Sequence, residues 1–200
     1  MDGTSQSADF LTYPWPDDIT SAVADLRDMS RGQLKRLFHC LPVPEMHEFV
    51  GEMKGVLLDQ GNAFANALTR RLVNRGGTWL GKGFVTGTDS WTDGYNIYQK
   101  SEGTLRTLQM QLHRHQSEYE DRLSIEYYHR QTGLVGRISD DMKRVCPGVF
   151  LGLGHVPFFP RLTPKLSRRV MFALVGPVAP GRPDAVERDV LDQQQASRAA

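Results

Sequence analysis

The chain has 200 residues, of which 40% are hydrophobic and 24% are charged, as expected for one globular domain with its own core. Its formal net charge is +1, which gives no electrostatic reason to expect nucleic acid or an anionic membrane as a partner. The longest apolar run, near Val170–Ala179, is too short to cross a bilayer. We therefore expect neither partner, and a homodimer stays open.

The cysteines and the start of the chain indicate a cytoplasmic protein. Cys40 and Cys146 are far apart and form no C-x-x-C motif. We interpret them as reduced thiols, with a single disulfide as the alternative. The polar start, Met1 to Ser5, lacks the basic region and apolar core of a signal peptide.

The first part of the chain is predicted to be helical. Residues 1–16 form an irregular arm, because two prolines favour extended backbone there. Two short helices follow over residues 17–29 and 30–41, each with apolar residues at helical spacing, and Pro42 ends the second.

A strand and a third helix come next. Phe49–Leu58 has the alternation of a strand, with Met53 and Leu57 on one side. Asn62–Asn74 has an apolar stripe at helical spacing.

The stretch Gly76–Phe84 holds Trp79, with Gly77 and Gly81 two residues to either side. A tryptophan has a large apolar area to bury and an indole N–H that needs a partner. Nearby glycines let a ring or another backbone approach closely, or let a strand bend. We interpret this stretch as the opening of a β-barrel with Trp79 packed across the barrel floor. The alternative is a glycine-rich loop.

After Trp79 the pattern is mostly that of β-structure. The predicted strands cover residues 94–100, 104–115, 121–129, 134–145, 149–156 and 169–175. With the two earlier strands they make about eight, enough for a closed antiparallel barrel around one small ligand. The helix between the first two strands lies either over the barrel mouth or on the surface, and the second arrangement is commoner. The barrel domain is expected to span residues 17–181, followed by a polar tail, 182–200.

Two motifs resemble a known family. Gly77-Thr78-Trp79-Leu80-Gly81 matches the G-x-W-x-G pattern of a family of bacterial lipocalin-like (calycin-type) barrel domains. The segments Asp140–Val145 and Pro147–Gly152 are similar to the closing strands of such barrels, and the resemblance covers roughly Leu37 to Val156. It implies a closed antiparallel barrel and an apolar ligand, and it carries over no catalytic residues.

The face of the strands that carries Leu, Met and Ile is expected to point into the barrel. Arg106 and Asp140 are expected to pair there, because a buried charge needs a partner. Tyr95, Tyr127 and His129 are expected to bind a ligand oxygen, and His129 or His155 to move a proton. The candidate catalytic residues are Tyr127, His129, Arg106 and Asp140. A plainer alternative places such polar residues at the solvent-exposed rim. The expected ligand-binding residues are Trp79, Tyr95, Leu108, Met110, Leu112, Leu123, Ile125, Met142, Leu151 and His155.

No metal or cofactor is expected. His113 and His115 point the same way along a strand and could join His129 in a metal site. However, they share a face with Gln109 and Gln111, which we expect outside, and no acidic ligand accompanies them. The chain also lacks a G-x-S-x-G motif, a P-loop and a dinucleotide-binding fingerprint.

Two functions of different class fit this sequence. The first is a cofactor-independent isomerase or cyclase of small-molecule metabolism or biosynthesis, acting on a hydrophobic ligand inside the barrel. The second is a non-catalytic carrier or storage protein for an apolar ligand. A cytoplasmic location favours the enzyme. An enzyme would lose turnover but keep binding when its catalytic residues are changed.

Overall fold

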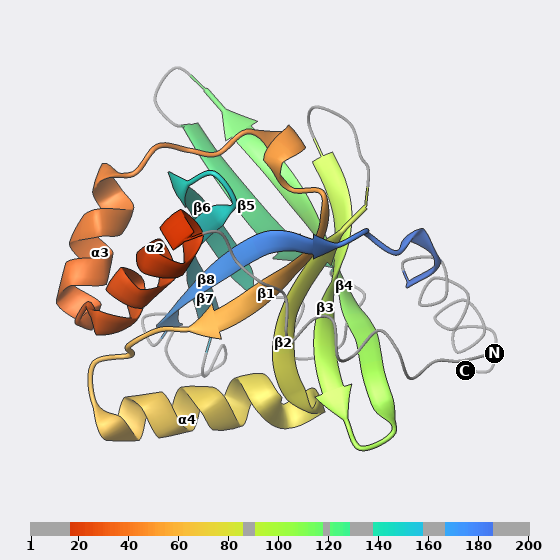
Figure 1. Cartoon of the computed structure of the whole chain (residues 1–200), viewed down its shortest axis with the longest axis horizontal. Coiled ribbons are helices and arrows are strands. Elements are labelled where there is room, and N and C mark those ends of the chain that lie inside the picture. Colours follow the sequence, from red (N-terminus) through yellow and green to blue (C-terminus); the bar gives the residue numbers. More distant parts are fainter. Residues whose placement is uncertain (1–16, 86–90, 118–120, 129–137, 158–166, 186–200) are drawn as a thin grey trace.

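The centre of the molecule is a closed antiparallel barrel in which consecutive strands pair and β8 pairs with β1 (Figure 1). The structure is a computed structural model that describes residues 17–85, 91–117, 121–128, 138–157 and 167–185. The strands are β1 (Gly51–Leu57), β2 (Thr78–Phe84), β3 (Trp91–Lys100), β4 (Gly103–Gln116), β5 (Asp121–Tyr127), β6 (Ser139–Cys146), β7 (Val149–Pro157) and β8 (Ser167–Ala179).

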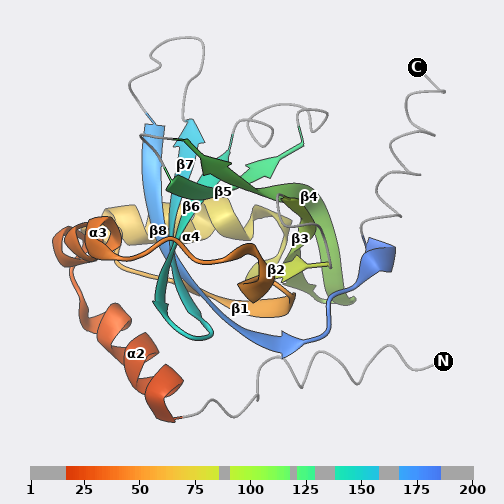
Figure 2. The same cartoon turned by 90° about the horizontal axis from the view of Figure 1, so that it is seen from above.

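The helices cover one side and one end of this barrel. Helices α2 (Asp17–Asp28) and α3 (Arg31–Cys40) lie on one side, where their apolar residues pack on the outer face of β7 and β8 (Figures 1 and 2). The short helix η1 (Met46–Glu48) leads into β1. Helix α4 (Ala63–Val73) and the turn η2 (Asn74–Gly76) connect β1 to β2 and cross one end of the barrel.

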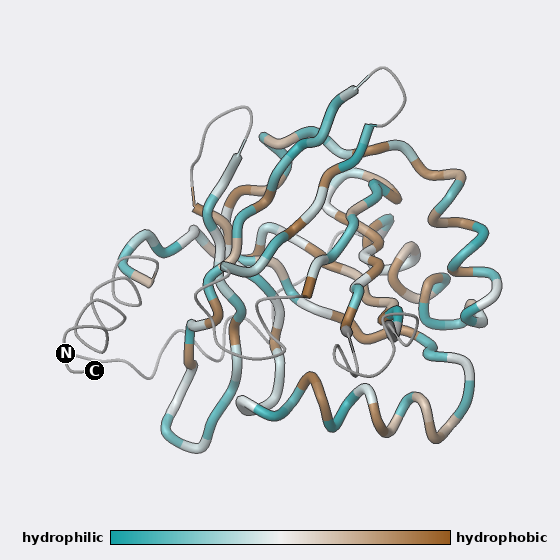
Figure 3. Tube along the Cα trace, turned by 180° about the vertical axis from the view of Figure 1, so that it is seen from behind, coloured by the Kyte–Doolittle hydropathy of each residue, from teal (hydrophilic) through white to brown (hydrophobic). Residues whose placement is uncertain are grey.

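The barrel interior has two halves. Away from α4 it is filled by buried apolar side chains, among them Phe49, whose ring contacts the rings of Phe84 and Phe150. Beneath α4 it encloses a cavity. Hydrophobic and hydrophilic residues alternate along the strands, as a barrel with one buried face requires (Figure 3).

Two β-bulges reverse this alternation within single strands. In β2 the register shifts between Trp79 and Gly81, and Gly81 takes a φ of 149°. A Cβ at Gly81 would lie 1.9 Å from the Met53 carbonyl oxygen, so only glycine fits there. In β4 an extra residue near Leu108, which has a φ of 56°, shifts the register against β3. In both strands, therefore, the odd-numbered side chains face inward before the bulge and the even-numbered side chains face inward after it.

The bulge in β4 turns Arg106 to the outer face of the barrel, contrary to the sequence-based expectation. Its guanidinium binds the buried Glu52 carboxylate through two hydrogen bonds of 2.6 and 3.0 Å. The Tyr95 hydroxyl donates to the same carboxylate at 2.9 Å and accepts the Arg182 backbone N–H at 2.8 Å. Residues 182–185 therefore contact the barrel, and buried Ala185 packs in an outer cluster with Tyr95.

The predicted mainly β fold, a closed antiparallel barrel with N-terminal helices and a helix between the first two strands, is confirmed. Trp79, however, lies at the α4 end beside the cavity, because β2 begins there, and it is only half-buried. The apolar floor is formed instead by the phenylalanine rings at the other end. None of the described helices is both long and apolar enough to cross a membrane.

Candidate functional site

A cavity of about 310 Å³ occupies the barrel end that α4 covers. This volume is at the lower end of the range of small-molecule sites, roughly 300–1,000 Å³. Helix α4 contributes Thr69, Leu72 and Val73 to the lining, so it lies over the barrel mouth and not merely on the surface. Most of the wall is apolar, and four polar side chains gather at one place in it: Lys82, Asn96, Tyr127 and Asp140.

Lys82 is the centre of this polar group. It comes from β2 and is only 2% exposed. Its ammonium group lies 2.6 Å from the Tyr127 hydroxyl oxygen, 3.0 Å from Asp140 Oδ2 and 3.3 Å from Asn96 Oδ1. It also lies 4.9 Å from the centre of the Tyr127 ring. Four strands therefore bring one cation, one carboxylate, one amide and one phenol together inside an apolar cavity.

The hydrogen bonds fix which groups donate. The indole Nε1–H of Trp79 can only donate, and it binds Asn96 Oδ1 at 3.1 Å. The Asn96 amide nitrogen therefore faces the Tyr127 hydroxyl, to which it donates at 3.0 Å. The Tyr127 oxygen thus accepts from both Asn96 and Lys82. Because both of its lone pairs are used, the Tyr127 O–H is left to donate into the cavity that the residue lines.

The protonation states agree with this pattern. Burial by itself would lower the pKa of Lys82, but the nearby Asp140 charge and the contact with Tyr127 raise that pKa overall. Lys82 is therefore a cation and not a neutral amine nucleophile. Burial raises the pKa of Tyr127 by more than the Lys82 charge lowers it, so the phenol keeps its proton at neutral pH. Burial likewise raises the pKa of Tyr98, another lining residue, to about 12.

Trp79 forms part of the wall beside this group. Its ring packs on β1 at Gly55, where an added Cβ would lie 2.5 Å from the indole. It also meets the Phe172 ring edge-on, with centroids 5.8 Å apart. The glycine at Gly55 is what allows the indole to lie flat against β1 and reach Asn96.

The structure places some of the predicted site residues inside the barrel. Tyr127 and Asp140 both line the cavity. Trp79 and Leu108 also line it, whereas other predicted ligand-binding residues belong to the apolar core beyond it: Met110, Leu112, Leu123, Ile125 and Met142.

Other predicted site residues lie on the outer face. Arg106 pairs with Glu52 and not with Asp140, whose partner is Lys82. Tyr95 lies beside that outer pair, and Leu151 packs under α2 and α3. The Nε2 atom of His155 lies 3.3 Å from Asp141 Oδ2. His155 pairs in register with Ser139, whose side chain is on the outward-facing side of β6. In β7 the inward positions are Phe150, Gly152 and Gly154, so their odd-numbered neighbours point out. His129 lies outside the described residues.

Lys82, Asn96 and Phe172 line the cavity but were not predicted as site residues from the sequence. Strict alternation from an inward Trp79 places Lys82 outside, and only the bulge at Gly81 turns it inward. A glycine inside a strand pattern is a recognised sign of a bulge, so Gly81 was the available signal. Asn96 carried no such signal.

Among the described residues, no group of three or more His, Cys, Asp or Glu is arranged to hold a metal ion. The rings of His113 and His115 have centroids 6.2 Å apart. The Nε2 atom of His115 lies 3.0 Å from the Ser124 hydroxyl.

Comparisons with known proteins support the fold and name no family. No known protein family matches the chain, so membership of the G-x-W-x-G family is not confirmed. No curated protein matches it either. A crystal structure of a protein from Thermomonospora curvata is similar, with a TM-score of 0.52 and 17% identity, over 79% of this chain and 95% of that one. At this identity the likeness supports a shared barrel fold alone.

Proposed function

We propose that the barrel cavity binds a small, largely apolar molecule that carries a carbonyl oxygen, and that the protein is a cofactor-independent isomerase or cyclase. The observation that carries this proposal is the Tyr127 hydroxyl. Its oxygen accepts hydrogen bonds from Lys82 and Asn96, and no described residue accepts its proton, which leaves that proton for a ligand in an apolar cavity. A buried donor without a fixed partner favours ligands that present an oxygen acceptor.

The same cavity supplies a base for proton transfer. Asp140 lines it beside Lys82 and would remove a proton from the carbon next to the carbonyl. The C–H electron pair would form a carbon–carbon double bond, and the carbonyl electron pair would move to oxygen. Tyr127, backed by the Lys82 charge, would stabilise that oxygen. Where a carbon–carbon double bond adjoins that carbon, the enolate extends over it, and returning the proton from Asp140 to the far carbon gives an isomer. Attack of the enolate carbon on a second carbonyl carbon of the ligand gives a ring, and the oxygen of that second carbonyl takes the proton from Asp140. Neither outcome needs an oxidant or a cofactor.

A carrier would use the cavity differently. It needs apolar walls, and it gains little from a charged pair at 2% and 7% side-chain exposure, because desolvating two charges is costly. The Lys82–Asp140 pair therefore favours the enzyme over the carrier.

Proton exchange in heavy water tests the proposal with a simple ketone. Acetophenone is incubated with the protein in D2O, and nuclear magnetic resonance follows deuterium incorporation into its methyl group. We expect exchange above the buffer rate, and loss of that exchange in Tyr127→Phe and Asp140→Asn while ketone binding persists. Binding without exchange would leave the carrier, and no binding of any ketone would overturn the proposal.

A further inference from the structure

The charges of the described side chains that line the cavity do not sum to zero. Deep inside, the Lys82 ammonium group and the Asp140 carboxylate neutralise each other at 3.0 Å. Arg75 in η2 also lines the cavity, and its side chain is exposed at the rim. Within the described parts of the chain, no carboxylate pairs with the Arg75 guanidinium. Among the described lining residues, one positive charge is therefore left uncompensated, at the solvent end.

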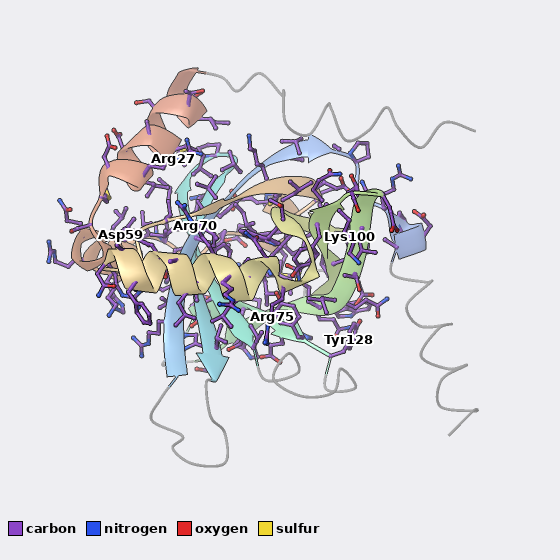
Figure 4. All side chains as sticks on the ribbon, turned by 90° about the horizontal axis from the view of Figure 1, so that it is seen from below. Arg27, Asp59, Arg70, Arg75, Lys100 and Tyr128 are labelled. Atoms are coloured by element: carbon purple, nitrogen blue, oxygen red, sulfur yellow. The ribbon has the colours of Figure 1, made fainter. Side chains whose placement is uncertain are left out.

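Arg75 is held at that rim by its neighbours. The Asn74 side chain accepts the backbone N–H of Trp79 at 2.9 Å, and the Asn74 carbonyl accepts the N–H of Gly77 at 3.2 Å. A Cβ at Gly76 would lie 3.6 Å from the ring of Tyr98, which is itself part of the cavity wall. Figure 4 views the molecule from the α4 side and shows Arg75 near the C-terminal end of that helix. The turn thus fixes the backbone of Arg75 beside the opening.

We infer that the ligand of this cavity is an oxo acid, with its carbonyl at Tyr127 and an acidic group, carboxylate or phosphate, bound at the mouth by Arg75. The inference rests on the proposed function, because it assumes that the carbonyl end lies at Tyr127. An arginine is always charged and presents several N–H donors in a fork that suits both acidic groups. A singly charged anion with an apolar body matches the described lining, whose net charge is zero at the deep end of the cavity and positive at the rim.

A series of aryl keto acids tests this inference by calorimetric titration. The members keep the acetophenone head and differ in the number of methylene groups between the ketone and a terminal carboxylate. Each acid is compared with its uncharged methyl ester, and the best acid is compared with the matching phosphate monoester. Arg75→Gln removes the charge at the mouth. Arg71→Gln is the matched control, because Arg71 is exposed on the adjoining helix α4 and is not among the described residues that line the cavity.

We expect one chain length to bind best, and Arg75→Gln to weaken that acid about three- to fivefold, the size of one partly exposed ion pair. The esters should bind equally well to both proteins, Arg71→Gln should change nothing, and raised salt should shrink the difference. Equal weakening of acid and ester, or no advantage of any acid over its ester in the unmodified protein, would overturn the inference while the proposed function stands. Failure of acetophenone and of every keto acid to bind would overturn both.

Discussion

Replacing Lys82 by methionine should destabilise the protein strongly. Methionine keeps most of the side-chain stem and removes the charge, so the change leaves the Asp140 carboxylate, 7% exposed, without its partner at 3.0 Å. Removing one member of a buried ion pair costs about 3–5 kcal/mol, because the other charge stays desolvated. For a domain of this size that loss corresponds to a fall of about 2 M in the urea midpoint.

The assay is urea unfolding followed by far-ultraviolet circular dichroism at neutral pH. Lys100→Met is the matched control, because Lys100 is exposed and its loss should change the free energy of unfolding by less than about 0.5 kcal/mol. The double variant Lys82→Met with Asp140→Asn removes both charges and should recover at least about half of the loss. A midpoint for Lys82→Met close to that of the control, or strictly additive losses in the double variant, would refute the buried pair.

Three further changes test other parts of the structure. Arg106→Met should lower the free energy of unfolding by about 3 kcal/mol, because it leaves the buried Glu52 carboxylate without its charged partner. The affinity for acetophenone should stay unchanged. Weaker ketone binding at unchanged stability would place Arg106 in the cavity after all. Gly55→Ala should push the Trp79 ring off β1, shift the tryptophan emission and cost about 1–3 kcal/mol, whereas an unchanged spectrum would contradict the close packing. The free energy of unfolding should fall as pH rises above about 10.5, because the folded state raises the pKa values of both Lys82 and Tyr127. The stability that these two groups contribute is complete only below their unfolded pKa values. Urea midpoints that stay flat up to about pH 11 would count against this.

The barrel could be predicted from the sequence because most strands follow regular alternation. Met53 and Leu57 in β1, and Leu123, Ile125 and Tyr127 in β5, face inward as that pattern indicates. The need of the Trp79 indole for a partner was also predictable, and Asn96 supplies it. These features are local, since each depends on one strand and its two faces.

The candidate site was harder to predict because two bulges decide it. The bulge at Gly81 turns Lys82 inward, and the bulge near Leu108 turns Arg106 outward. A bulge depends on how a strand fits its neighbours around the closed barrel, and this fit cannot be read from the sequence of any single segment. Gly81 gave a hint of the first bulge, whereas Leu108 adopts its positive φ with no glycine nearby in the strand.

The most direct test of the proposed site compares two ligands of the same shape on two proteins. Acetophenone and α-methylstyrene differ only in the replacement of C=O by C=CH2, and Tyr127→Phe removes only the phenolic oxygen. By calorimetric titration, Tyr127→Phe should weaken acetophenone binding by about 1–1.5 kcal/mol, or roughly tenfold, and leave α-methylstyrene unchanged. Equal affinities of acetophenone for the two folded proteins would contradict the assignment of Tyr127 as the donor in the cavity.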